Sequence, residues 1–250
     1  MPTRYKGFGY WEIASRQMSI VSKSEQQRFK DAKIAVIGTG GIGGQTNEML
    51  ARMGLGELTI IDMDEYDFSN LNRQTMASLD TIGIPKTEAT KERLRKINPY
   101  TKVNAINEKL EEGNLDKALS GADILIDALD NLFTRVIASR YAREHEIPFI
   151  HGAIHGTQGQ ISVFTNETPS YEELFSLPTK GRELDDAAKE DLSKLTIGVP
   201  PVIGPVPNII GCLEAMEAYK IITGIGKVAY APKLLTFDLL DLESFETVEL

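Results

Sequence analysis

The stretch Gly38-Thr-Gly40-Gly41-Ile-Gly43 decides the fold, because it stands between an apolar run and a predicted helix. Residues 33–37 are short, apolar and rich in β-branched side chains, which predicts a buried parallel strand ending at a turn. A helix is expected over residues 43–53. In such a setting the first glycine permits a tight turn, the second lets the backbone approach a phosphate, and the third lets helix and strand pack closely. The stretch therefore predicts a phosphate-binding loop at a helix N-terminus.

The same strand-and-helix alternation continues outward from this loop. Further strands are expected at residues 58–62, 103–106, 124–127 and from 149 onward, with helices at 86–97, 114–119 and 135–144. Strands alternating with helices predict a doubly wound, Rossmann-like α/β fold with a mainly parallel sheet. Ahead of the first strand, residues 11–30 are expected to form a helix.

The pattern changes after residue 155. Residues 160–165 alternate between apolar and polar side chains, and residues 233–250 predict two more strands, so antiparallel strands should extend the sheet. Residues 166–197 are charged and irregular, with a helical tendency near 183–193, and predict a crossover loop. A helix from Asn208 to Thr223, ended by Gly224, should follow. We expect one domain over residues 1–250, comprising an N-terminal helix and arm (11–30), a nucleotide-binding core (33–155) and an antiparallel extension (156–250).

The composition excludes several classes of protein. Apolar residues make up 42% and charged residues 25% of the 250 residues, which is ordinary for a globular chain. The formal net charge of −9 argues against nucleic acid as the main partner, because phosphate binding needs a basic excess. A single cysteine excludes an intramolecular disulfide and a cysteine-only zinc site. With no apolar run long enough for a leader or a membrane span, we expect a cytoplasmic protein.

Charged residues beyond the glycine loop indicate which nucleotide is bound. Asp62 ends a predicted strand, where its carboxylate can accept from ribose hydroxyls. The loop and Asp62 would suit NAD equally well. Arg73 and Lys86 can together neutralise a triphosphate, which a dehydrogenase does not need. Asp130 follows the fourth strand, and one carboxylate combined with phosphate oxygens is typical magnesium ligation. No P-loop motif is present.

These motifs together resemble the ubiquitin-activating-enzyme-like adenylyltransferases, the ThiF/MoeB/HesA superfamily. The resemblance covers most of the chain. It implies an ATP- and magnesium-dependent enzyme that adenylylates a carboxylate and releases pyrophosphate. The matching motifs are Arg16-Gln17, the glycine loop, Asp62, Ser69–Gln74, Gly83–Lys86, Asn98-Pro99, Asp127–Asn131, Gly159–Phe164 and Gly204-Pro-Val.

The resemblance also implies roles for individual residues. Arg16 corresponds to an arginine that reaches the γ-phosphate from a partner subunit, which would make the active unit a homodimer. Asp130 corresponds to the magnesium ligand. The residues expected to act in catalysis are Arg16, Arg73, Lys86 and Asp130. The residues expected to bind the nucleotide are Gly38, Gly40, Gly41, Gly43, Asp62, Asn70, Arg73, Gln74, Lys86, Asp130 and Asn131.

The chain departs from the family pattern at its cysteines. Many members carry two Cys-x-x-Cys pairs for zinc, which one cysteine cannot supply. Cys212 falls in the predicted late helix, and we expect a buried small hydrophobe there rather than a thioester-forming residue. The adenylate would then pass to a separate acceptor protein or thiol. His151 and His155 follow a strand beside glycines, which disfavours a metal pair, and His155 is a candidate substrate contact.

Two substrate classes and one other enzyme class remain open. The default substrate of the family is the Gly-Gly C-terminus of a ubiquitin-like sulfur-carrier protein. Other members adenylylate small acids, such as the guanylylpyridinol precursor of the iron-guanylylpyridinol cofactor. The missing zinc ligands and loop cysteine favour a small-molecule carboxylate. An NAD-dependent dehydrogenase is the alternative from another class, and a catalytically silent nucleotide-binding module is a further one.

Overall fold

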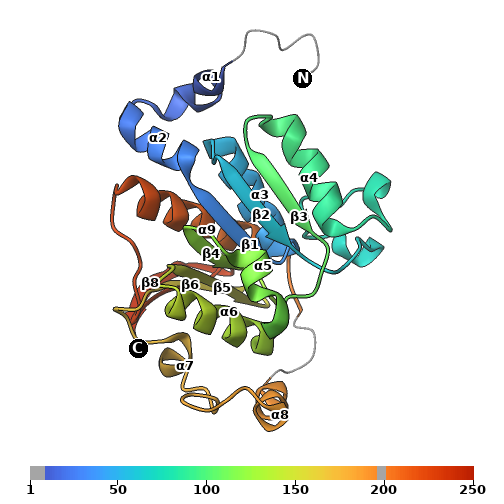
Figure 1. Ribbon diagram of the computed structural model, residues 1–250, viewed down its shortest axis with the longest axis vertical. Coiled ribbons are helices and arrows are strands. Elements are labelled where there is room, and N and C mark those ends of the chain that lie inside the picture. Colours follow the sequence, from blue (N-terminus) through green and yellow to red (C-terminus); the bar gives the residue numbers. More distant parts are fainter. Residues whose placement is uncertain (1–8, 196–200) are drawn as a thin grey trace.

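The computed structural model describes residues 9–195 and 201–250, and within them the strands form one sheet. The strand order is β3-β2-β1-β4-β5-β6-β7-β8 (Figure 1). The strands are β1 (Lys33–Ile37), β2 (Glu57–Ile61), β3 (Lys102–Ile106), β4 (Ile124–Asp127), β5 (Phe149–His155), β6 (Gln158–Phe164), β7 (Lys233–Asp238) and β8 (Asp241–Glu249). Strands β1 to β5 pair in parallel and β6 to β8 pair antiparallel at one edge, which confirms the predicted Rossmann-like fold.

Strand β1 lies where the strand order reverses. It pairs with β2 on one side, Ile37 opposite Ile61, and with β4 on the other, Ile37 opposite Asp127. The carboxyl ends of these three strands therefore meet at one edge of the sheet. In open α/β sheets, a crevice for ligands forms outside the carboxyl ends of the strands at such a reversal. The topology thus determines where the site is built.

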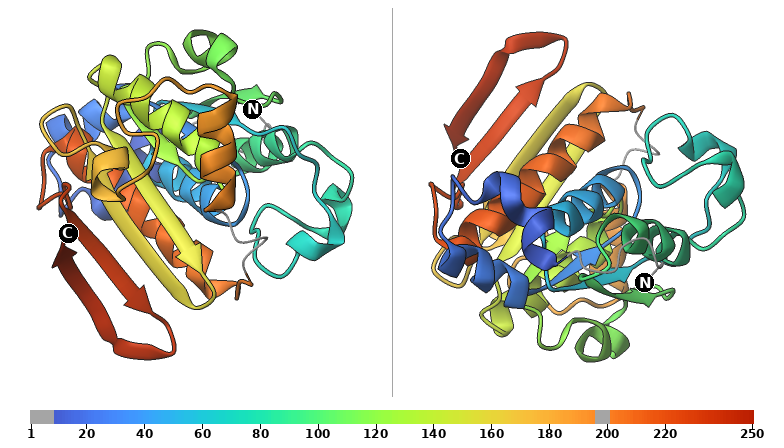
Figure 2. Two further views of the ribbon diagram at one scale, coloured as in Figure 1. Left: turned by 90° about the horizontal axis from the view of Figure 1, so that it is seen from below. Right: turned by 90° about the horizontal axis from the view of Figure 1, so that it is seen from above.

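Helices cover both faces of the sheet (Figures 1 and 2). One apolar core joins the sheet to α2, α3, α4 and α9, and a second joins its other face to α5, α6, α7 and α8. Both cores are built from aliphatic and aromatic side chains that exclude water. The helices that enclose these cores are α2 (Lys23–Asp31), α3 (Gly41–Met53), α4 (Lys86–Ile97), α5 (Leu115–Leu119), α6 (Leu132–Glu144), α7 (Tyr171–Leu174), α8 (Asp186–Lys194) and α9 (Pro205–Thr223).

The prediction of one helix over residues 11–30 is wrong. The segment forms α1 (Tyr10–Ala14), a 3₁₀ turn at Ser15–Gln17 and then α2. Ser22 starts α2 afresh, since its Oγ accepts from the Glu25 N–H at 3.2 Å and its own N–H donates to Glu25 Oε2 at 2.6 Å. This reciprocal cap satisfies N–H groups that the first turn of a helix leaves free.

Helix α9 begins three residues before the predicted start. Pro205 occupies its first turn, a position where a missing N–H costs nothing. Asn208 lies inside the helix, and its Nδ2 donates to the Gly204 carbonyl oxygen at 2.5 Å. The predicted end is confirmed, because Gly224 takes a φ of 77° as the C-cap. No helix in the described part of the chain, α9 included, is both long and apolar enough to cross a bilayer.

A buried polar network fastens the N-terminal segment to the end of α3. The Tyr10 hydroxyl donates to the Gly54 carbonyl oxygen at 2.6 Å. The Met53 carbonyl oxygen accepts from Gln17 Nε2 at 2.8 Å and from Gln26 Nε2 at 2.9 Å. These bonds satisfy carbonyl groups that the last turn of α3 leaves unpaired. They fix the position of the segment that carries Arg16.

The expected crossover segment contains two helices, α7 and α8, and is attached to α6 by Arg140. The Arg140 guanidinium makes two bonds to the Glu172 carboxylate, Nε to Oε2 at 2.7 Å and Nη2 to Oε1 at 2.8 Å. It also donates to the carbonyl oxygens of Thr179 at 2.7 Å and Arg182 at 2.8 Å. Arginine suits this task because its planar fork carries five donors. Residues 196 and 197 of the expected loop lie outside the described residues.

Candidate nucleotide-binding site

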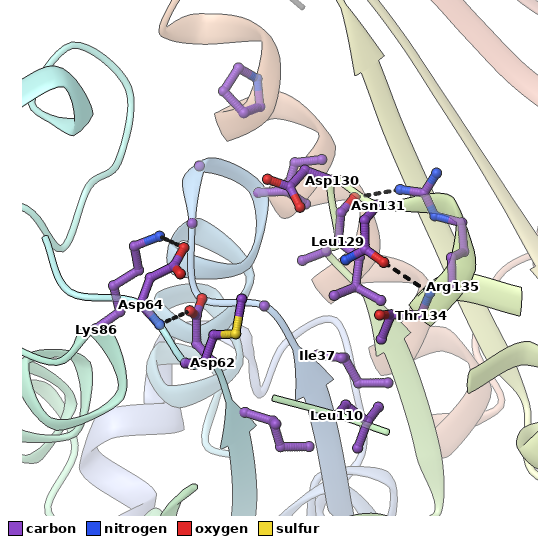
Figure 3. Close-up of a pocket in the computed structure, with 18 of the residues that line it drawn as sticks. Ile37, Asp62, Asp64, Lys86, Leu110, Leu129, Asp130, Asn131, Thr134 and Arg135 are labelled. Carbon is purple, nitrogen blue, oxygen red and sulfur yellow. Dashed lines mark hydrogen bonds and ion pairs between the residues drawn. The ribbon is translucent and has the colours of Figure 1, made fainter. Parts of the chain in front are cut away.

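A cavity of roughly 290 Å³ opens at the carboxyl ends of β1, β2 and β4 (Figure 3). Its lining joins the glycine loop to α4, α6 and the start of α9. The predicted residues that line it are Gly38, Gly40, Gly41, Asp62, Arg73, Gln74, Lys86, Asp130 and Asn131. Gly43, Asn70 and Arg16 do not line it. Nine of the twelve predicted residues therefore line one cavity, although they are spread over 94 residues, from Gly38 to Asn131.

The glycine loop packs against the turn after β4. Gly38 takes a φ of +97°, and a Cβ there would lie 2.6 Å from the Ala128 carbonyl oxygen. A Cβ on Gly43 would lie 1.9 Å from the Gly38 carbonyl oxygen. Side chains at these two positions are therefore sterically excluded. Gly43 packs against the Gly38 carbonyl oxygen within the loop, and it does not line the cavity.

The Asp62 carboxylate is hydrogen-bonded to the glycine loop. Its Oδ2 accepts from the Thr39 N–H at 2.7 Å and from the Thr39 hydroxyl at 3.0 Å. Its Oδ1 accepts from the Asp64 N–H at 2.9 Å. A carboxylate has about four acceptor positions, so ribose hydroxyls can still bond to it. Asp62 therefore positions the loop in addition to its predicted role at the ribose.

Lys86 begins α4, as predicted, and its side chain is 9% exposed. Its ammonium nitrogen lies 2.8 Å from Asp64 Oδ2 (Figure 3). Its backbone N–H donates to the Asp64 carbonyl oxygen at 2.9 Å. Asp64 also lines the cavity, but the sequence reasoning assigned it no role. Its position two residues after Asp62, at the same end of a predicted strand, was the available signal.

The segment around Arg73 places a guanidinium at the cavity and is held together by hydrogen bonds within the segment. Arg73 Nη1 donates at 2.8 Å both to the Ser69 carbonyl oxygen and to Asn72 Oδ1. Asn70 is buried, and its Oδ1 accepts from the Asp67 N–H at 3.0 Å, so its side chain caps a 3₁₀ turn behind the cavity. Gln74 is buried in the wall, and its Oε1 has no hydrogen-bond partner among the described residues.

The turn after β4 carries Asp130, a carboxylate with no hydrogen-bond or ion-pair partner among residues 9–195 and 201–250. Asn131 caps α6, since its Oδ1 accepts from the Thr134 N–H at 2.9 Å. Asp130 is exposed at the cavity, and no dashed line joins it to the other residues drawn in Figure 3. The described residues contain no group of three or more His, Cys, Asp or Glu side chains arranged to hold a metal. A cation at Asp130 would therefore take its remaining ligands from a nucleotide and water.

A buried ionic cluster lies beneath this turn. Asp127 Oδ2 is 2.5 Å from Arg135 Nε and 2.7 Å from His151 Nδ1. Burial works to raise the pKa of Asp127, but the Arg135 guanidinium and His151 bring it below its usual value. Burial lowers the pKa of His151, which favours the neutral imidazole. The sequence reasoning missed Arg135, because nothing in the sequence distinguishes it from a surface arginine of α6.

Two other predictions concern cysteine and histidine. Cys212 is exposed, so the prediction of burial is wrong. The preceding Gly211 is the inward residue, since a Cβ there would lie 2.6 Å from the Ile42 carbonyl oxygen of α3, and the next residue of a helix points in another direction. His155 ends β5 and is exposed, with its neighbours Ala153 and Ile154 in the cavity wall.

Arg16 is exposed in the 3₁₀ turn before α2. The neighbouring Gln17 is bonded to the Met53 carbonyl oxygen, at the C-terminal end of α3. The glycine loop lies at the opposite end of this helix, which has 13 residues. At 1.5 Å per residue, α3 separates the two ends by about 20 Å. The structure therefore does not bring Arg16 to the cavity of its own chain.

Sequence comparison relates the chain to proteins of known name. The model of the ThiF family matches residues 14–250. The SAMP-activating enzyme E1 of Haloferax volcanii is 33% identical over 231 residues, which cover 92% of this chain and 81% of that protein. The molybdopterin-synthase adenylyltransferase of Haemophilus influenzae is 35% identical over 204 residues, covering 81% of this chain and 79% of that protein.

Structural comparison shows the same fold in a solved protein. The crystal structure of Escherichia coli MccB with ATP superposes with a TM-score of 0.78 at 24% identity, covering 100% of this chain and 73% of that one. The family match over residues 14–250 extends across nearly the whole chain. The chain therefore belongs to the ThiF family and is an enzyme of the adenylyltransferase class.

Proposed function

We propose that the protein uses ATP and Mg²⁺ to adenylylate a carboxylate, forming an acyl-adenylate and pyrophosphate. One observation carries the proposal: two cations, Arg73 and Lys86, share a cavity with the ribose-side carboxylate Asp62 and the free carboxylate Asp130. A dinucleotide site needs no such pair of cations beyond the ribose. A dehydrogenase, or a silent binding module, would leave Arg73, Lys86 and Asp130 unexplained.

The reaction needs charge stabilisation rather than a protein nucleophile. An oxygen of the substrate carboxylate bonds to the α-phosphorus, and the bond from that phosphorus to the bridging oxygen breaks. Its electron pair leaves with the pyrophosphate, and no proton is transferred. The attacking and leaving groups are both anionic, so fixed cations at Arg73 and Lys86 lower the barrier. The N–H groups at the start of α3 bind phosphate oxygens.

The residues present fit a magnesium ion. Mg²⁺ is usually held by one or two carboxylates together with substrate phosphates and water, and Asp130 is an exposed carboxylate at the cavity. When bound, the ion would neutralise charge on the phosphate oxygens. Asp130 would orient the metal-nucleotide complex relative to Arg73 and Lys86.

We further propose a homodimer in which Arg16 completes the partner's site. The separation of about 20 Å along α3 supports this, because an arginine side chain does not span that distance, and Arg16 is exposed, as a residue that crosses an interface must be. Both sites of a two-fold dimer would be completed in the same way. The single adenylation domain over residues 1–250, with its arm, core and extension, is part of the same proposal.

The C-terminal Gly-Gly carboxylate of a ubiquitin-like carrier protein is the first candidate substrate. Similarity to a protein named SAMP-activating enzyme E1, and to the sulfur carrier protein adenylyltransferase of Thermus thermophilus at 32% identity, supports it. A small-molecule carboxylate, such as a guanylylpyridinol acid, is the second candidate. The single cysteine favours it, because one thiol cannot supply two Cys-x-x-Cys pairs. With Cys212 on α9, the adenylate would pass to a separate acceptor protein or thiol.

ATP–pyrophosphate exchange tests the proposal. The enzyme is incubated with labelled pyrophosphate, ATP and Mg²⁺, with a Gly-Gly carrier in one series and the guanylylpyridinol acid in another. Exchange that depends on one of these carboxylates supports adenylylation and identifies the substrate class. A chain that exchanges with neither but binds NAD tightly, and not ATP, would instead fit the dehydrogenase alternative.

A further inference from the structure

The residue before Asp130 is held at both ends of its backbone. The Leu129 N–H donates to Asp127 Oδ1 at 3.0 Å. The Leu129 carbonyl oxygen accepts from Arg135 Nη2 at 2.5 Å (Figure 3). The carboxylate and the guanidinium that hold Leu129 are themselves ion-paired, with 2.5 Å between Asp127 Oδ2 and Arg135 Nε.

The ion pair between Asp127 and Arg135 is unusual because both side chains are largely withdrawn from solvent. The side chains of Asp127 and Arg135 are 0% and 12% exposed. Replacing a buried ion pair by apolar side chains of similar size is often neutral or stabilising, so such a pair is weak evidence for a role in stability. His151 adds a bond to Asp127 from β5 and is itself fully buried. The cluster is thus fixed on three sides, directly beneath the turn that carries Asp130.

Holding Leu129 also fixes Asp130. The Leu129 carbonyl group and the Asp130 N–H and Cα belong to one planar peptide unit, so anchoring that oxygen sets the direction in which Asp130 leaves the turn. On the other side, the Asn131 cap ties the following residue to the start of α6. Between these two anchors, Asp130 adjusts through its own backbone and side-chain torsions.

We propose that Arg135 and Asp127 are positioning residues that aim the Asp130 carboxylate at the metal-nucleotide complex; this inference rests on the proposed function. Arg135 lines the cavity, but its charge is compensated by Asp127 at 2.5 Å. Arg135 therefore orients the turn that carries Asp130 and adds no net positive charge to the cavity, unlike Arg73. Residues that orient a metal ligand typically change metal affinity or activity by about 10- to 100-fold when replaced.

The test is calorimetric titration of ATP, with and without Mg²⁺, into protein that lacks a carboxylate substrate. Arg135→Lys keeps the charge, but an ammonium cannot serve Asp127 and the Leu129 carbonyl in the same fork geometry. The double variant Asp127→Asn with Arg135→Met removes both charges together, which avoids leaving one buried and unpaired. Asp130→Ala reports the loss of the metal ligand. Arg143→Lys is the control, an arginine of α6 whose hydrogen bonds to the described residues go to carbonyl oxygens of residues 165–168, away from the cavity.

We expect Mg²⁺ to tighten ATP binding in the wild type and in Arg143→Lys. In Arg135→Lys and in the double variant this gain should fall by about 10- to 100-fold, as in Asp130→Ala, while metal-free ATP affinity and Tm stay near wild type. Retention of the full gain in both Arg135→Lys and the double variant would overturn this inference but leave the proposed function standing. So would an equal loss of metal-free affinity, because Arg135 would then bind phosphate directly. A wild type that binds no ATP would overturn the proposed function and this inference with it.

Discussion

Asp64 holds Lys86 twice, through its side chain and through its backbone. Asp64 Oδ2 lies 2.8 Å from the ammonium nitrogen, and the Asp64 carbonyl oxygen accepts the Lys86 N–H at 2.9 Å. The ammonium is mostly buried and Asp64 is about half exposed. Lys86 is thus held in place at the cavity before a nucleotide arrives.

Replacing Asp64 by Ala should therefore lower stability in a way that ATP reverses. The buried ammonium loses its partner, which costs about 1 kcal/mol after allowance for the exposed carboxylate. Phosphate oxygens can then take the place of the carboxylate, so saturating Mg·ATP should raise Tm more in the variant than in the wild type. Thermal denaturation with and without Mg·ATP measures this. Equal ligand-induced shifts would count against Lys86 as a phosphate ligand.

Mixing two inactive proteins tests Arg16. Arg16→Ala lacks the arm cation and Lys86→Ala lacks the cavity cation, so each homodimer should have little exchange activity. In a 1:1 mixture, half of the dimers pair one subunit of each kind, and one site of each pair is intact. Exchange should recover to about a quarter of wild type. No recovery after subunit exchange, verified by native mass spectrometry, would contradict action across the interface.

Glu214 should make stability depend on pH. It lies buried in α9 with its Oε2 accepting from the Thr46 hydroxyl at 2.7 Å, and its Oε1 has no hydrogen-bond partner among the described residues. Burial raises its pKa well above 4.5, with Asp127 acting in the same direction and Arg135 against it. An acid whose pKa is raised by folding stabilises the folded state below its unfolded pKa, and this contribution is lost as pH rises through the folded pKa.

Glu214→Gln should consequently be as stable as the wild type near pH 4 and more stable at pH 7 to 8. Each kcal/mol gained would appear as about 2–4 °C in Tm for a chain of this size. The measurement is Tm against pH for both proteins. Parallel curves would show that Glu214 does not titrate with the folding equilibrium.

Cys212→Ser should keep exchange and turnover within about twofold, as expected for an exposed substitution away from the cavity. The thiol lies 3.5 Å from Gln45 Nε2. Steady-state kinetics with the physiological acceptor would measure the effect. Loss of the chemical step in a folded variant would restore an enzyme-bound thioester as an intermediate.

The sequence predicted the parts of the fold whose signals are local. Lys86 to Ile97 begins and ends as expected, because Pro85 precedes the helix and Pro99 follows it. The glycine loop and Asp62 were recognised from their spacing after a strand. The helix break near Ser22 was also locally encoded, by the capping pair Ser22 and Glu25.

The parts that could not be predicted depend on distant partners. Arg135 becomes part of the site only because β4 ends beneath its helix, and Cys212 is exposed because Gly211 takes the contact with α3. Asn70 carries a family motif, yet its side chain here bonds to the Asp67 backbone. Sequence spacing indicates which side chains reach one edge of the sheet, whereas their individual bonds depend on tertiary packing.

Arg140 has a consequence for how the protein responds to proteases. Lys180 is exposed, and cleavage after it would separate the Glu172–Thr179 side of the crossover segment from Arg182. Each piece would keep its own bond to the same guanidinium on α6, and Arg182 would also keep its ion pair with Asp191 at 3.0 Å. Trypsin-nicked protein should therefore run as two bands under denaturing conditions and elute as one species on a native column. Continuity of the backbone is not what keeps this segment in place.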